Sequence, residues 1–143
     1  MRCAQGCIME QNKFLEMVKS TEKSVIALDF DGVIHNHYKG YGDGTIYGDP
    51  IEGSLESIKE LYELGYTLKI YSCKSCSDRP LVNNKTGPEL IRGWLEKHKV
   101  SEYVKEICTE KPNALAYIDD KGVRFTTWNQ AIKDLRKFKI IGE

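Results

Sequence analysis

The stretch VIALDFDGV, residues 25–33, decides the fold of this chain. Its first part is a short, continuous apolar run, which is typical of a strand buried on both faces of a parallel sheet. Gly32 is expected to end the strand. Asp29 and Asp31 lie two residues apart on an extended backbone, so both side chains point to the same side. The plainer interpretation is that the acids and the glycine form a solvated turn.

Strand and helix patterns alternate along the rest of the chain. Helices are expected at 9–19, from Ser54 to Gly65, from Pro88 onward and at 128–138. Further strands are expected at 66–71, 104–108, 116–118 and 123–125, and a short turn or helix at 112–115. Residues 35–50 predict a loop or small flap that is not a packed element. This alternation indicates an α/β fold, a three-layer Rossmann-like and mainly parallel sheet with helices on both faces.

Length and composition favour one domain over residues 1–143, with residues 1–23 as an N-terminal helical extension. Lys plus Arg equals Asp plus Glu at 21 each, so no overall positive field would attract nucleic acid. The sequence has no apolar run of the roughly 20 residues that a membrane helix needs. Without a signal-peptide pattern, a cytoplasmic protein is expected, and five cysteines predict free thiols.

Further polar residues follow the later strands, and each has a plain interpretation. Ser72 follows the strand at 66–71; its hydroxyl would suit a phosphate oxygen, although such a serine is more often a cap or turn residue. Lys111 precedes Pro112 and would ordinarily be a solvated loop residue. Asp119 and Asp120 follow the strand at 116–118, where they would either cap a turn or hold a hard divalent cation. In a parallel sheet these strand ends form one ligand-binding edge.

The order Asp-x-Asp, Ser, Lys, Asp-Asp resembles the haloacid dehalogenase superfamily of phosphotransferases. The resemblance covers Val25 to Phe125 and suggests a small member without a cap domain. Its first motif is matched by Asp29-Phe30-Asp31-Gly32 and its second by Ser72. The third is matched by Lys111 and the fourth by Asp119 and Asp120. Val33 stands where many members carry threonine, a change that the family tolerates.

The resemblance implies a magnesium-dependent phosphatase. Asp29 would attack phosphorus and form an aspartyl-phosphate, while Asp31 would protonate the leaving group and then activate water. Mg²⁺ would bind the Asp29 carboxylate, the Asp31 backbone carbonyl and one acid of the pair Asp119 and Asp120.

The rest of the expected site binds substrate. The resemblance implies that Lys111 and Ser72 bind the phosphoryl oxygens. Gly32 and Cys73 are expected beside them, at the substrate.

Three alternatives to a general phosphomonoesterase remain open. A response-regulator receiver domain uses similar residues, but there the acid pair comes first and Asp31 would have no role. A nucleotide or polynucleotide-end phosphatase is the nearest enzyme. A phosphate- or metal-binding regulatory module without turnover is the remaining choice. Neither inter-motif segment has room for a cap domain, which favours exposed macromolecular phosphates or, with a partner subunit, small phosphorylated molecules.

Several residues near these motifs are expected to carry no chemistry. Cys73 and Cys76 would form a redox pair or half a zinc site only with further ligands, so they are interpreted as small loop residues. His35 and His37 are interpreted as solvated. The flap tyrosines would stack on a base or sugar, or simply pack the flap on its own domain; they are Tyr38, Tyr41 and Tyr47.

Overall fold

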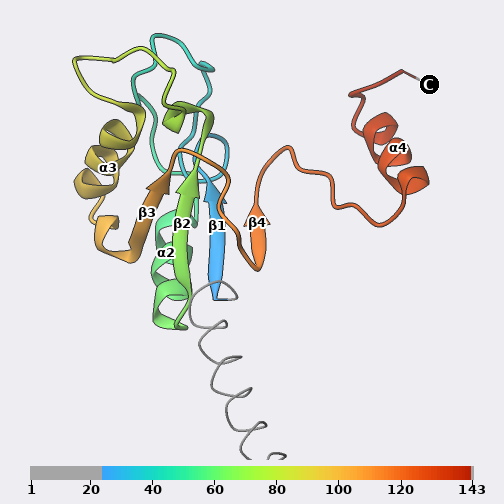
Figure 1. Ribbon diagram of the computed structural model, residues 1–143, viewed down its shortest axis with the longest axis horizontal. Coiled ribbons are helices and arrows are strands. Elements are labelled where there is room, and N and C mark those ends of the chain that lie inside the picture. Colours follow the sequence, from blue (N-terminus) through green and yellow to red (C-terminus); the bar gives the residue numbers. More distant parts are fainter. Residues whose placement is uncertain (1–23, 143) are drawn as a thin grey trace, which may run out of the picture.

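Four parallel strands form the centre of the computed structural model, which describes residues 24–142. In chain order the strands are β1 (Val25–Asp29), β2 (Thr67–Tyr71), β3 (Val104–Cys108) and β4 (Ala116–Ile118). The order across the sheet is β3-β2-β1-β4, and every pairing is parallel (Figure 1). The predicted mixed α/β fold with a parallel sheet is therefore confirmed. The helix expected at 9–19 lies outside the described residues.

The helices of the described chain begin at the residues that the capping pattern indicates. They are α2 (Ser54–Glu63), α3 (Gly87–Lys97) and α4 (Trp128–Lys137), with short 3₁₀ turns η2 (Cys73–Ser75) and η3 (Ser101–Tyr103). The side chain of Thr86 accepts from the Glu89 N–H and caps α3, and Thr127 caps α4 in the same way. Gly65 follows α2 with a φ of 96°, a conformation suited to glycine.

Two expected elements are wrong. Residues 112–115 form no helix, and residues 123–125 run without regular structure. Pro112 restricts the residue before it, and the connection from β3 to β4 is too short for a packed helix. Strand propensity at 123–125 depends on pairing with a neighbouring strand, and the sheet of the described chain ends at β4.

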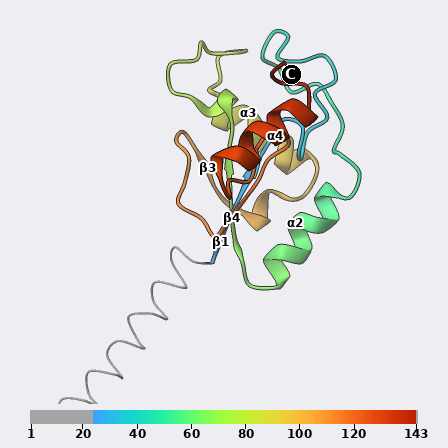
Figure 2. The ribbon, with the colours of Figure 1, turned by 90° about the vertical axis from the view of Figure 1, so that its right-hand side faces the viewer.

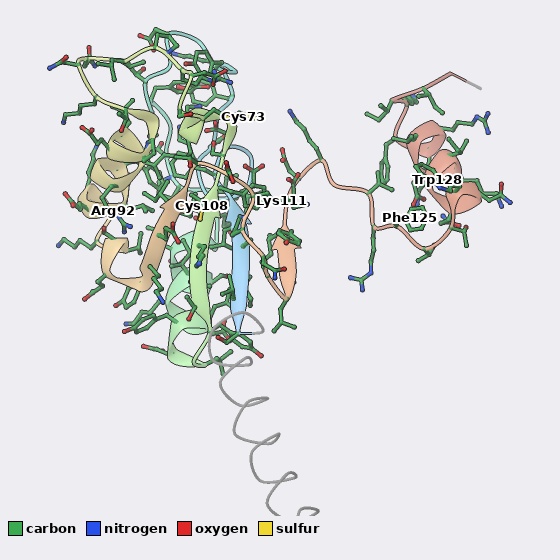
Figure 3. The ribbon with its side chains drawn as sticks, viewed as in Figure 1. Cys73, Arg92, Cys108, Lys111, Phe125 and Trp128 are labelled. Carbon is green, nitrogen blue, oxygen red and sulfur yellow. The ribbon has the colours of Figure 1, made fainter. Side chains whose placement is uncertain are left out.

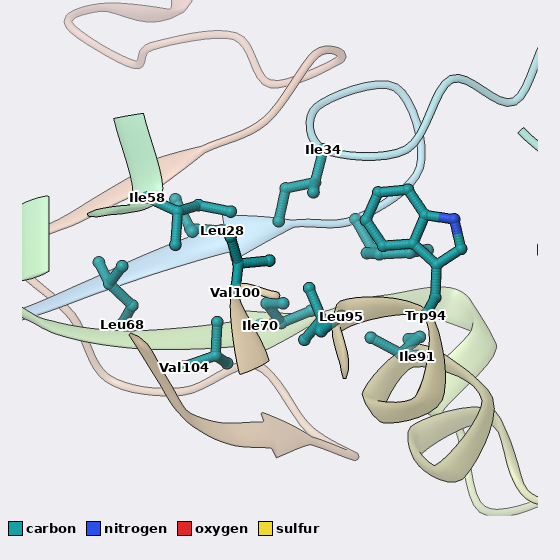
Figure 4. Close-up of a cluster of buried hydrophobic side chains, with 11 residues drawn as sticks. Leu28, Ile34, Ile58, Leu68, Ile70, Ile91, Trp94, Leu95, Val100 and Val104 are labelled. Atoms are coloured by element: carbon teal, nitrogen blue, oxygen red, sulfur yellow. The ribbon is translucent and has the colours of Figure 1, made fainter. Parts of the chain in front are cut away.

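One face of the sheet carries the hydrophobic core. Leu28, Leu68 and Ile70 point from β1 and β2 toward α2 and α3, and none is more than 3% exposed. Figure 4 shows these side chains meeting Ile58 of α2 and Leu95 of α3. Each of them is a large apolar group removed from water, which stabilises this layer by about 1.5–3 kcal/mol per side chain.

The part of the chain that the structure describes does not place helices on both faces of the sheet, as the sequence predicts. Helices α2 and α3 share the core face, while residues 109–115 cross the opposite face on the way from β3 to β4 (Figures 1 and 2). Steps β1 to β2 to β3 run in one direction, and the step to β4 returns past β1. A right-handed connection in the reverse direction must cross the other face. The return strand is reached by a short loop, so no helix among residues 24–142 forms a layer on this face.

The strands are added in one direction from β1 to β3, and β4 is then added on the other side of β1, which creates a switch point between β1 and β4. In open parallel sheets, ligands bind beyond the carboxyl ends of the strands at such a point. Asp29 ends β1, and Asp119 follows β4 directly. The sheet order thus brings together acids that are distant in the sequence.

The last part of the chain stands apart from the sheet. After β4, residues 119–127 extend outward and lead to α4 (Figure 1). We call residues 119–142 the C-terminal arm. None of the helices described is long and apolar enough to cross a membrane.

Candidate active site

Three carboxylates converge at the switch point. Asp29, Asp119 and Asp120 each offer an oxygen, and these oxygens lie within 4.8 Å of one another. Gly32 permits this approach: its φ is +84°, and a Cβ at this position would lie 2.2 Å from the Asp120 carboxylate oxygen Oδ2. Any side chain at position 32 would therefore displace Asp120. The structure thus brings together three residues of the predicted metal site, and their role as metal ligands stays a prediction.

Asp29 is the most enclosed member of this acid cluster. Its Oδ1 accepts the Phe30 N–H at 2.8 Å. Burial raises the pKa of Asp29 to about 6, against the lowering effect of that hydrogen bond, and the charges of Asp119, Asp120 and Asp31 raise it further. A carboxylate in this position is a better base and nucleophile than a solvated one, and it is stabilised by any nearby cation.

Asp119 is held from two directions. Its Oδ1 accepts the Lys121 N–H at 2.7 Å and the Gly122 N–H at 3.2 Å, so the residue forms a tight turn after β4. The Tyr71 hydroxyl, from the neighbouring part of the sheet, donates to Oδ2 at 3.2 Å. Burial and then the Asp119 charge raise the pKa of Tyr71 to about 12, so the phenol keeps its proton.

Asp31 has a different environment from the three clustered acids. Its Oδ1 accepts from His35 Nδ1 at 2.8 Å, and its Oδ2 pairs with Lys74 Nζ at 2.5 Å. The His35 Nε2 accepts the Gly48 N–H at 2.9 Å, which assigns the ring proton to Nδ1. The Asp31 carboxylate is thus fixed between a cation and an imidazole donor, and its backbone carbonyl stays a predicted ligand.

The charge state of Asp31 follows from this pairing. Burial by itself would raise the pKa of the Asp31 carboxyl, but hydrogen bonds from His35 and Lys74 outweigh it and hold the pKa below its ordinary value. Asp31 is therefore an anion at neutral pH. This form suits a base that takes a proton from water, and it disfavours the proton-donating role that the family resemblance implies.

Lys111 lies on the face of the sheet opposite the hydrophobic core, the face that residues 109–115 cross. It belongs to the connection between β3 and β4 (Figure 3), and its ammonium group lies 4.2 Å from the centroid of the Tyr117 ring. Tyr117 packs edge-to-face against Tyr71, whose hydroxyl bonds Asp119. The predicted catalytic lysine is thus linked to the acid cluster through two aromatic rings, and Lys74 is the lysine in direct contact with an acid of the site.

Ser72 and Cys73 lie where β2 runs into the turn η2. The Ser72 hydroxyl accepts the Lys74 N–H at 3.1 Å, which is the capping role named above as the plain interpretation. Its role toward a phosphate stays a prediction. The turn aims Lys74 inward, and Gly87 at the start of α3 supports it: a Cβ there would lie 1.5 Å from the Lys74 carbonyl oxygen. Cys73, Cys76 and Cys108 are free thiols, as expected, and the first two are exposed.

The flap at 35–50 is packed at its base and exposed at its tip. His35 is 0% exposed and stacks on Phe30, so its interpretation as a solvated residue is wrong. The Trp94 indole N–H donates to the Gly48 carbonyl at 3.1 Å and ties the base to α3. At the tip, Tyr41 covers Lys74.

Arg79 stacks on the same tyrosine, with its guanidinium carbon 4.5 Å from the ring centroid of Tyr41. Tyr41 therefore lies beside two cations, of which Lys74, from η2, also contacts Asp31 directly.

Sequence reasoning missed Lys74 and His35. Both carry a local signal: Lys74 is two residues beyond a serine that ends a strand, and His35 is four residues beyond Asp31. The Cys-Lys-Ser-Cys sequence directs attention to its cysteines, and a Gly- and Tyr-rich context suggests solvent for the histidine. Both residues belong to the site because α3 and the flap bury them, and this tertiary packing is not visible in the local sequence.

The residues of the cluster fit a hard divalent cation. All three groups are carboxylates, the ligands that Mg²⁺ prefers, and two of them are exposed enough to keep water on the ion. Burial, and then the charges of Asp119, Asp120 and Asp31, raise the pKa of Asp29, and a cation at the cluster would favour its ionised form.

Comparisons with known protein families, with curated proteins and with solved structures find no match.

Proposed function

We propose that this protein is a magnesium-dependent phosphomonoester hydrolase that uses Asp29 as its nucleophile, as the resemblance to the haloacid dehalogenase superfamily implies. The observation that carries the proposal is the convergence of Asp29, Asp119 and Asp120 at the switch point of the sheet. The fit of three carboxylates to one divalent cation supports Mg²⁺ as the cofactor. When bound, the cation would neutralise charge on the phosphoryl oxygens and let an anionic nucleophile approach.

In the first step, an Asp29 carboxylate oxygen bonds to phosphorus, and the bond from phosphorus to the leaving oxygen breaks. The aspartyl-phosphate divides one difficult displacement into two easier ones. The leaving oxygen takes a proton as it departs, and Asp31, two residues beyond Asp29, is the acid that the resemblance assigns to supply it. The anionic form of Asp31 is favoured in the resting site, so aryl phosphates, whose leaving groups need little protonation, are the most suitable first substrates.

In the second step, Asp31 takes a proton from water as the water oxygen attacks phosphorus, and the acyl phosphate bond to Asp29 breaks. The pairing with Lys74 and His35 supports this step, because it keeps Asp31 ionised and fixes its orientation. We propose that Lys74, which contacts Asp31, supplies positive charge to the phosphoryl group, and that Arg79, on the loop after η2, adds to it. Ser72 and Lys111 keep their predicted roles toward the same group.

An open edge favours exposed phosphates as substrates. Residues 31–53 and 72–86 surround the acids, and in the structure they form loops, a flap and one short turn. The tip residue Tyr38 is 68% exposed and offers a ring to a base or sugar, which supports the nucleotide or polynucleotide-end alternative.

The test is hydrolysis of a generic aryl phosphate with Mg²⁺, with EDTA and with Asp29→Asn. We expect activity that needs the cation and falls by on the order of 10³-fold or more in the variant. The exposed Asp78→Asn serves as a matched control that leaves the rate unchanged. Undiminished activity of Asp29→Asn would sink the mechanism. A folded, magnesium-binding protein without turnover on any phosphate ester would favour the regulatory module.

A further inference from the structure

The C-terminal arm exposes a set of large apolar side chains. Trp128 is 73% exposed and Phe125 is 58% exposed, and the two rings lie edge-to-face at 5.3 Å (Figure 3). Phe138 and Ile140, beyond the helix, are 62% and 69% exposed. A helix that buries so little is marginal alone, because isolated helices of this length are seldom stable in water. The exposed apolar side chains of the arm therefore indicate that a further surface packs against them.

The body of the molecule has an apolar groove beside its last strand. The groove has a volume of about 280 Å³ and runs between α2 and the strands β1 and β4. Its apolar lining includes Leu28, Val33, Ile58, Leu61 and Ile118. Ile118 is 43% exposed, although it belongs to the sheet. A surface of this kind in a parallel sheet is normally covered by a helix.

The arm beyond the acid cluster is basic, and the groove has an acidic residue at its rim. Among residues 121–142 the one acidic residue is Asp134, and six residues are basic: Lys121, Arg124, Lys133, Arg136, Lys137 and Lys139. Glu52 is the charged residue among those that line the groove. Opposite potentials orient two surfaces and discriminate against other partners.

We propose that two copies of this chain exchange their arms, so that α4 of each copy docks in the groove of the other. The structure carries α4 away from its own groove on the extended segment 119–127 (Figure 1). A segment of this length spans up to about 30 Å, enough to reach a neighbouring body. A two-fold axis makes both contacts identical, as in other exchanged dimers.

The area available is sufficient for a stable dimer. The aromatic residues Phe125, Trp128 and Phe138 bury about 150–250 Å² each when they are covered. Since these side chains are 58–73% exposed, two arms would bury roughly 600–1,000 Å² through them, and the groove surfaces that they cover would add to this area. A specific interface needs about 1,000 Å² or more. The proposal does not depend on the phosphatase function.

The experiment measures mass in solution by light scattering and native mass spectrometry over a concentration series of the full chain. We expect a dimer for the natural sequence. Trp128→Ser/Phe138→Ser should weaken the dimer at least tenfold, since buried tryptophan contacts are the strongest at interfaces. Tyr38→Ser/Leu81→Ser is the matched control, because these side chains have similar exposure outside the arm and groove. It should leave the dimer unchanged.

A groove variant gives a second, independent measurement. Ser57→Arg, at an exposed groove position, fills the groove with a long cation and should also yield monomers. Mixing this variant, which has a normal arm, with the arm variant, which has a normal groove, should restore a heterodimer through one contact. Circular dichroism verifies that each variant is folded.

Three outcomes would overturn the proposal. Monomers at all concentrations, with α4 amides protected from exchange, would mean that the arm folds back into its own groove. A dimer that persists in both variants would mean that another surface joins the copies. A monomer whose basic arm binds a single-stranded oligonucleotide, and loses it in the arm variant, would assign the arm to nucleic acid.

Discussion

Lys74 and Asp31 form the best-enclosed ion pair described in the structure. The lysine side chain is 3% exposed and that of Asp31 is 15% exposed. A pair of this kind contributes little when intact, but the removal of one partner leaves a charge without compensation. The pair is therefore a sensitive reporter of the site.

The first prediction concerns Lys74→Met. The free energy of unfolding should fall by about 2 kcal/mol at pH 7, less than for a fully dry pair because Asp31 retains contact with water. The double variant Asp31→Asn/Lys74→Met should recover most of the loss. Urea denaturation measures both, and a double variant less stable than Lys74→Met alone would contradict the pairing.

The same pair makes a prediction about pH. The pKa of Asp31 is lowered in the folded protein, so its contribution to stability is present above the unfolded pKa of about 4 and is lost as pH falls through the folded pKa. In Lys74→Met this contribution is smaller, because the hydrogen bond and charge of Lys74 are lost while the hydrogen bond from His35 remains. Between pH 5 and 3, by urea denaturation, the natural protein should lose more stability than the variant, and equal slopes would count against the proposed charge state.

The effect of Asp29 on the pH dependence of stability has the opposite sign. Its raised pKa of about 6 means that the folded state binds the proton more tightly, so stability decreases as pH rises from about 4 to about 6. In EDTA at pH 7.5, Asp29→Asn should be more stable than the natural protein by about 1 kcal/mol, a value reduced for the partial exposure of the group. Scanning calorimetry should show that Mg²⁺ stabilises the natural protein more than the variant. Equal stabilisation of both would exclude Asp29 as a ligand.

At the scale of elements, the sequence predicts those strands and helix ends that depend on neighbouring residues in the chain. Apolar runs located β1 and β2, and Gly65 and Pro88 marked a helix end and a helix start. The helical layer expected on the second face did not follow, because the length of the β3–β4 connection overrides the general alternation. Lys74 was missed for a related reason: its burial depends on how closely α3 approaches the turn η2, which no local pattern encodes.

The start of α3 offers a prediction with a built-in control. Gly87→Ala should destabilise the protein by about 2 kcal/mol or more, since the new methyl group would overlap the Lys74 carbonyl oxygen and force the helix and turn apart. Gly93→Ala, in the same helix, meets nothing within 4 Å and should stabilise by about 0.5–1 kcal/mol. Thermal unfolding of both variants makes the comparison, and a neutral Gly87→Ala would show that the turn is free to move.

At the scale of the whole molecule, the body and the arm should differ in their hydrogen exchange. Amides of β1 and β2 lie at the centre of the sheet and should exchange only by global unfolding. If the arms dock as proposed, amides of α4 in Ser57→Arg, which blocks the groove, should exchange at least about 100-fold faster than in the natural protein, while those of β1 keep their rates. Mass spectrometry of peptides resolves the two regions, and a slowly exchanging α4 in this variant would place the helix on another surface.

The position of β1 between β2 and β4 also affects how the protein is made. The acid cluster joins Asp29, at the end of β1, to Asp119 and Asp120, which follow β4, so the three acids can meet only after Asp120 has left the ribosome. A chain that stops before this point would hold Asp29 without its partner acids. Metal binding by newly made chains is therefore expected only once residues 29–120 have been synthesised and released.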